Sequence, residues 1–131
     1  MYKQGFAALL LMSCLTSHAM AQEGHPLVGS WLGDWGTSPD ERNFLTLILE
    51  WDGENISGIV NPGPNATPVR MARLDSSTWT VTLEMDVQNS SGESVRLVAE
   101  GQLENIGSYS RSLSGSVRHA DGSGDFQLAR Q

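Results

Sequence analysis

The stretch LVGSWLGDW, Leu27–Trp35, contains two of the four tryptophans and opens a chain of almost purely β-type sequence. Successive side chains of a strand point to opposite sides, so Trp31, Gly33 and Trp35 share one face. Gly29 and Gly33 carry no side chain and therefore permit a bend or the close approach of another backbone. We expect this stretch to form the first strand of a small closed barrel.

Short runs with period-2 alternation follow this stretch and are separated by turn-forming residues. The clearest is Trp79–Val87, and Ser94–Leu103 and Leu113–Val117 repeat the pattern. Residues 36–43 are expected to form a loop. Asp52-Gly53 is a hairpin signal, while residues 61–68, NPGPNATP, contain three prolines that exclude regular structure. Seven or eight such runs without a convincing helix predict an all-β fold, an antiparallel up-and-down barrel of about eight strands whose closure removes exposed edges.

Residues 1–21 have the three parts of a secretory signal peptide. Lys3 supplies a positive charge, Phe6–Met12 is an apolar run too short to span a bilayer, and Ala19-Met20-Ala21 is a small-residue cleavage site. We therefore expect an exported protein, periplasmic or secreted, in which residues 22–131 form a single β-barrel domain.

Cys14 is the only cysteine, and it follows a loose version of a bacterial lipid-attachment box. We expect Cys14 to be removed with the leader. The alternative is that a lipid on this residue anchors the protein to a membrane surface. No later stretch has the ~20 continuous apolar residues of a transmembrane helix.

The charge of the chain argues against some classes of partner. Removal of Lys3 with the leader leaves seven arginines against 15 acidic residues, a net charge of −8 with no lysine. Nucleic acids and anionic membranes attract basic surfaces, so neither is an expected partner.

Gly29-Ser30-Trp31 in the first predicted strand, together with Arg130 in the last, resembles the structural signature of calycins. This group includes the lipocalins, the fatty-acid-binding proteins, the avidins and small secreted bacterial relatives. The resemblance implies that Trp31 packs across the closed end of a barrel with an arginine over its ring, a contact worth roughly 0.5–2 kcal/mol. Arg130 is the first candidate for that arginine and Arg118 the second. The resemblance concerns the fold and identifies no ligand.

No catalytic or metal-binding constellation stands out in the sequence. His25 and His119 follow no triad or nucleophile-elbow pattern, and the spacing of zinc ligands is absent. Asp121 and Asp125 alternate as in a calcium loop, but the distal glutamate is missing. We therefore expect no metal or cofactor, and a binding protein rather than an enzyme.

A small, mostly apolar ligand in the barrel interior is the leading functional hypothesis, since an eight-stranded barrel has room for one small molecule. Small residues at inward positions, Ala99, Gly101 and Gly115, leave space in the late strands. The aromatic residues expected to contact the ligand are Trp35, Trp51, Trp79, Phe44 and Tyr109.

The run Phe44–Trp51 is unusual because both of its faces are apolar. We expect the loop at residues 61–68 to cover Phe44 and Ile48; alternatively, these two residues contact a partner or a second subunit in a homodimer. Two further functions stay open. One is an exported protein-interaction module, such as a protease inhibitor acting through a tail at residues 22–26. The other is a cavity-type isomerase or cyclase with Glu50 as its single acid.

Overall fold

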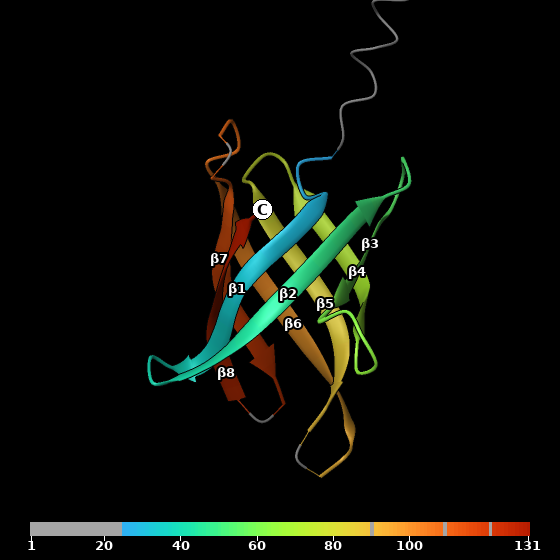
Figure 1. The fold of residues 1–131 in the computed structure, drawn as a ribbon, viewed down its shortest axis with the longest axis vertical. Helices are drawn as coiled ribbons and strands as arrows, with labels where there is room; N and C mark the ends of the chain where they lie inside the picture. The colour runs from blue at the N-terminus through green and yellow to red at the C-terminus, as the bar shows by residue number, and fades with distance from the viewer. Residues whose placement is uncertain (1–24, 90, 109, 121) are drawn as a thin grey trace, which may run out of the picture.

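The computed structural model describes residues 25–131, except 90, 109 and 121, and within that part of the chain it is a closed antiparallel barrel (Figure 1). Each strand pairs with the next in sequence, and β8 returns to pair with β1. The all-β, eight-stranded, up-and-down barrel predicted from the sequence is confirmed. The eight strands are β1 (Gly29–Ser38), β2 (Glu41–Trp51), β3 (Ile56–Val60), β4 (Thr67–Asp75), β5 (Thr80–Gln88), β6 (Ser94–Glu104), β7 (Ser112–His119) and β8 (Gly122–Arg130).

Period-2 alternation decides which side chains enter the barrel. In β5, Val81, Leu83 and Met85 are buried, while the threonines and acidic residues between them are less buried. The same alternation in the other strands produces a core of aliphatic side chains around Trp31, which is 0% exposed. No charged or polar residue belongs to the buried set of the described residues. In that same part of the chain, we find no helix with the length and hydropathy that crossing a membrane requires.

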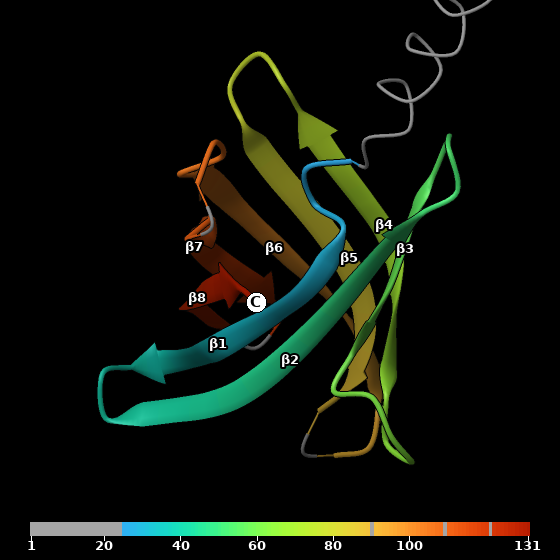
Figure 2. The same ribbon diagram turned by 45° about the horizontal axis from the view of Figure 1, so that its top comes forward.

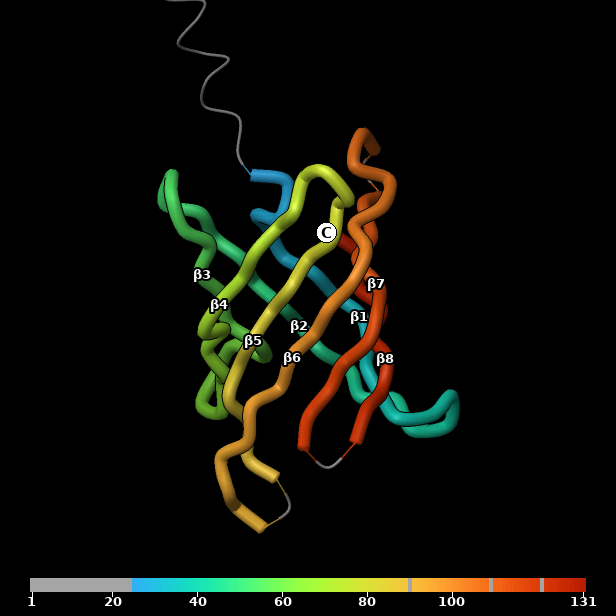
Figure 3. Tube along the Cα trace, turned by 180° about the vertical axis from the view of Figure 1, so that it is seen from behind, coloured from blue at the N-terminus to red at the C-terminus, as the bar shows by residue number. Residues whose placement is uncertain are grey.

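The strands are tilted against the barrel axis, so that β1 and β2 at the front of the barrel cross β5 and β6 behind them (Figures 1 and 3). The segment before β1, the turn after β2, the turn after β4 and the loop after β6 lie at one end, which we call the closed end. The connections after β1, β3, β5 and β7 lie at the other end, which we call the mouth.

Two boundaries differ from the sequence-based expectation. Residues 36–43 were expected to form a loop, but β1 and β2 extend into a hairpin whose tight turn is Pro39-Asp40. The polar side chains of this stretch face solvent on both strands and therefore mask its strand character. Trp79 was expected to begin a strand, but its φ of 57° ends the β4–β5 turn instead, and β5 starts one residue later.

The predicted signal peptide, Cys14 and Tyr109 lie outside the described residues. The assignment of residues 22–131 to a single domain also stays a prediction.

Candidate functional site

Three side chains close one end of the barrel by holding the segment before β1. Trp31 Nε1, Arg111 Nη1 and Arg130 Nε donate to the carbonyls of Leu27, Pro26 and Val28 at 2.9, 2.6 and 2.8 Å. Because these three carbonyls are consecutive, the segment lies fixed across the barrel end. The side chain of Leu27, which belongs to this segment, is fully buried.

The residues of the expected signature meet at this closed end. Arg130 pairs directly with Trp31 across β1 and β8, and a Cβ placed on Gly29 would lie 2.7 Å from Arg130 Nε. Gly29 also has a φ of +134°, which favours glycine. Arg118 is exposed on β7 near the mouth, opposite Ser123, and does not lie beside Trp31.

Arg111 is a closed-end residue that the sequence analysis did not identify. It donates to the carbonyl of Pro26, 85 positions earlier, and to the carbonyl of Ile106 at 2.8 Å. Its Nε is buried without a hydrogen-bond partner. No local pattern marks this arginine, since it lies at the end of a loop and its more distant partner is recognisable only in the folded chain.

The interior toward the mouth contains a cavity of about 200 Å³. All eight strands contribute to its wall, and among the described residues the polar side chains on it are Asn61 and Thr67, both at the β3–β4 connection. The apolar lining consists of Trp35, Leu45, Leu47, Val60, Leu83, Met85, Val87, Leu97, Ala99, Val117, Phe126 and Leu128.

Small residues shape this cavity differently from the expectation. The space beside Gly101 is occupied by Phe126, whose Cζ would lie 2.8 Å from a Cβ at position 101. Ala99, two residues before Gly101 on the same face of β6, does line the cavity. The hollow part of the barrel is therefore displaced toward the mouth, and Phe126 forms its inner wall.

Of the four described aromatic residues expected at the ligand, the structure places only Trp35 on the cavity. Trp51 is 41% exposed at the closed end, with its ring centroid 5.7 Å from that of His25. Trp79 is partly buried against the core at the β4–β5 turn, also at the closed end. Phe44 points outward and is 92% exposed. The four described residues of this set therefore do not form one site.

The loop between β3 and β4 does not cover Phe44. Pro62 and Ile48 border the same outer hollow, so the loop lies beside Ile48, and Asn61 exchanges hydrogen bonds with the backbone of Thr46. Leu32 and Ile59, 42% and 37% exposed, continue this apolar outer surface across β1, β2 and β3.

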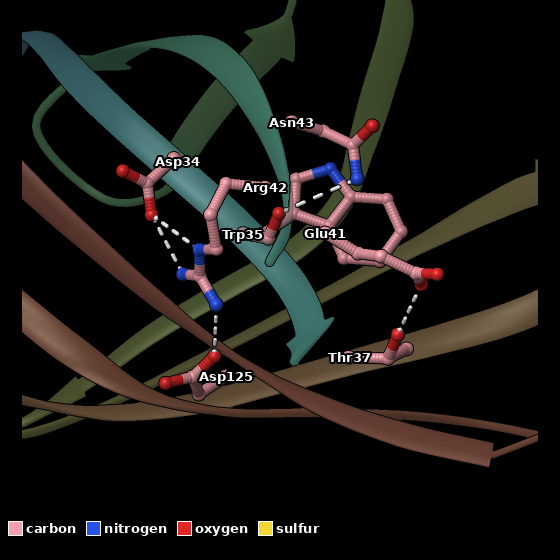
Figure 4. A network of polar contacts seen from close by, with 7 residues as sticks. All are labelled: Asp34, Trp35, Thr37, Glu41, Arg42, Asn43 and Asp125. Atoms are coloured by element: carbon pink, nitrogen blue, oxygen red, sulfur yellow. Dashed lines mark hydrogen bonds and ion pairs between the residues drawn. The ribbon is translucent and has the colours of Figure 1, made fainter. Parts of the chain in front are cut away.

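An ion-pair network braces the strands next to Trp35 (Figure 4). Arg42 donates from Nε and Nη2 to Asp34 Oδ1 at 3.0 and 2.6 Å, and from Nη1 to Asp125 Oδ1 at 2.5 Å. These hydrogen bonds raise the pKa of Arg42, with Asp125 contributing most. The network joins β2 to β1 and β8 on the outer side of the wall that carries Trp35.

No ionisable side chain belongs to the described wall of the cavity. Glu50 is exposed on the outer face of β2, opposite Ser57, and borders an outer hollow with Ile48 and Ile59. The enzymatic hypothesis required Glu50 to face the interior, and the structure does not place it there. Within the described residues, no three His, Cys, Asp or Glu side chains are grouped closely enough to hold a metal ion.

Comparison with known proteins gave no matching family model, curated protein or solved structure. The closed barrel is compatible with a calycin-like fold, and membership of that group stays a prediction.

Proposed function

We propose that this protein is a binding protein that holds one small, mostly apolar molecule in the cavity behind its mouth. The observation that carries the proposal is the lining of the cavity, twelve apolar side chains against two polar ones. Burial of an apolar molecule against such a surface contributes about 25 cal/mol per Å² of apolar surface removed from water.

The volume limits the size of the ligand. An apolar cavity of roughly 150 Å³ accommodates benzene, so about 200 Å³ suits a single or fused small ring or a short branched chain. Long fatty acids exceed this volume. Asn61 and Thr67, on the wall beside the β3–β4 connection, can direct one polar group of the ligand toward the mouth.

Binding without catalysis fits the same wall. General acid–base chemistry needs an ionisable group within hydrogen-bond reach of the substrate, and the described lining supplies none. The export expected from residues 1–21 belongs to this proposal, in which the barrel carries or senses a small apolar molecule outside the cytoplasm.

The test is titration of the protein with naphthalene, indole and 1-hexanol, monitored by tryptophan fluorescence and by two-dimensional amide NMR. We expect saturable binding with shifts confined to amides around the mouth-side interior. Ala99→Leu places three extra carbons into the cavity and should abolish binding. Ala129→Leu makes the same change on the exposed face of β8 and should leave binding intact.

Stability measurements on the same pair make the test decisive. Insertion of carbons into a filled interior costs about 1–3 kcal/mol, whereas a hollow one accepts them at lower cost. The proposal would be refuted if Ala99→Leu caused a large loss of stability and the unsubstituted protein bound none of the three probes.

A further inference from the structure

Among the strand pairs of the closed barrel, the pairing between β3 and β4 is the shortest. These strands share only three paired positions, Gly58↔Val69, Ile59↔Pro68 and Val60↔Thr67. β4 continues to Asp75 and pairs with β5 along this length, with a register irregularity between Val69 and Met71. Among the described residues, positions 70–74 have no ladder partner on the β3 side.

An unpaired strand edge exposes backbone donors and acceptors at alternate residues, and these groups pair readily with another extended segment. Figure 2 shows the β2–β3 hairpin and the end of β4 pointing in different directions, with β4 extending on the side of the closed end. The edge at residues 70–74 is about 16 Å long at the rise of a strand, enough for a partner strand of four to six residues.

A hollow of about 530 Å³ lies along this edge. Residues 70–74 of β4 form one side, and the β2–β3 hairpin together with His25 forms the other. Ile56, Ala72 and Leu74 are partly buried against the core and give the floor of the hollow an apolar part, while Glu54, Asn55, Arg70 and Arg73 make the rest of its wall polar. It is separate from the ligand cavity, because no residue of its wall belongs to the lining of that cavity.

The charged side chains that border the hollow are two arginines on β4, Arg70 and Arg73, and one acid on the facing hairpin, Glu54, so the β4 side favours an acidic segment. Arg70 is already paired with Asp86 at 2.7 Å, whereas Arg73 is exposed and forms no ion pair within 4 Å among the described residues. Arg73 lies on the outward face, between the inward-facing Ala72 and Leu74. A strand added beside it would therefore carry apolar side chains inward and a carboxylate outward.

We propose that the β4 edge at residues 70–74 is a docking site for an extended peptide segment of a partner protein, with alternating apolar and acidic side chains. Main-chain hydrogen bonds to β4 supply the affinity, and the apolar floor and Arg73 supply the selectivity. The β2–β3 hairpin bounds the hollow on its second side.

The test uses the full chain and an acetylated, amidated hexapeptide of alternating valine and glutamate. Control peptides replace the glutamates by lysines or carry N-methyl groups on the backbone. Amide NMR should show shifts at residues 70–74 and at the facing hairpin, and the N-methylated peptide should bind at least about tenfold more weakly, since it cannot complete the ladder.

Charge-reversal variants define the role of Arg73. Arg73→Glu should weaken binding of the glutamate peptide by about threefold to tenfold, in the range expected for an exposed ion pair turned into a repulsion. It should also strengthen binding of the lysine peptide. Arg118→Glu makes the same change of net charge on exposed β7 near the mouth and should alter neither affinity.

Four results would overturn the proposal. Shifts at the Phe44 surface or the mouth would place the peptide elsewhere, and equal binding of the N-methylated peptide would exclude strand addition. The third is strong hydrogen-exchange protection of residues 70–74 in the free protein, with no peptide binding. If this protection does not depend on protein concentration, the edge is occupied by the chain's own N-terminal residues. Protection that increases with concentration would assign it to a second copy.

Discussion

Trp31→Phe is the substitution that most directly tests how the closed end is held. The indole of Trp31 is 0% exposed, and its Nε1 donates to the carbonyl of Leu27 at 2.9 Å. Phenylalanine removes that donor and leaves a buried carbonyl unsatisfied, which costs about 1–3 kcal/mol. The smaller ring adds roughly 1–2 kcal/mol for lost packing. We therefore expect a total loss of about 2–5 kcal/mol, a large part of the ~5–15 kcal/mol typical of a domain.

The free energy of unfolding, measured by urea titration with far-UV circular dichroism, provides the assay. Trp35→Phe is the matched control, because it makes the same chemical change four residues later on the same face of β1. Trp35 is only half-buried on the cavity wall, so its replacement should cost less than about 1 kcal/mol while weakening the binding of indole or naphthalene.

The opposite pattern would refute this division of roles. If Trp31→Phe lost less than about 1 kcal/mol, the hydrogen bond to Leu27 would not close the barrel end. If Trp31→Phe abolished ligand binding in the folded protein and Trp35→Phe did not, the ligand would lie at the closed end rather than behind the mouth.

Three further predictions concern individual residues. Gly29→Ala should lower the free energy of unfolding by about 1–3 kcal/mol in a urea titration, because its φ of +134° is strained for alanine and the new methyl group would meet Arg130; an unchanged midpoint would contradict this. Arg42→Gln leaves Asp34 without its cation, so the urea midpoint should decrease at low salt and recover part of the difference in 0.5 M (roughly three times physiological) NaCl; a salt-independent loss would exclude an electrostatic role. Burial lowers the pKa of His25 below its ordinary 6.5. On acidification His25 is therefore protonated in the unfolded chain before it is protonated in the folded one, so the free energy of unfolding should decrease as the pH falls below about 6.5. His25→Gln should flatten that dependence, and an unchanged slope in this variant would show that another group is responsible.

Local sequence patterns were sufficient to predict the strands because backbone alternation is a property of neighbouring residues. The run Trp79–Val87 identified β5 to within one residue, and Asp52-Gly53 identified the β2–β3 turn. The hairpin at residues 36–43 was missed, since its strands are polar on the surface and Arg42 is paired with Asp34 and Asp125 only in the folded state.

The candidate site was predicted less completely than the fold. Five aromatic residues were taken as its wall, but of the four that the structure describes only Trp35 reaches the cavity, and most of the wall is aliphatic. An inward-facing position can be read from alternation, whereas its height along the barrel depends on strand tilt and register. Trp51 and Trp79 share the inward pattern with Trp35, yet register places both at the opposite end.

LVGSWLGDW, Leu27–Trp35, shows this division within nine residues. The sequence by itself determined that the stretch is a strand, that Trp31 and Trp35 share a face, and that Gly29 permits close packing there. Only the tertiary structure decided that Arg130 and Arg111 close the barrel above Trp31, that the hollow part lies beside Trp35, and that β4 retains an unpaired edge. The physical reason is that alternation arises between adjacent residues, while closure, cavity and edge arise from the register between strands that are distant in the chain.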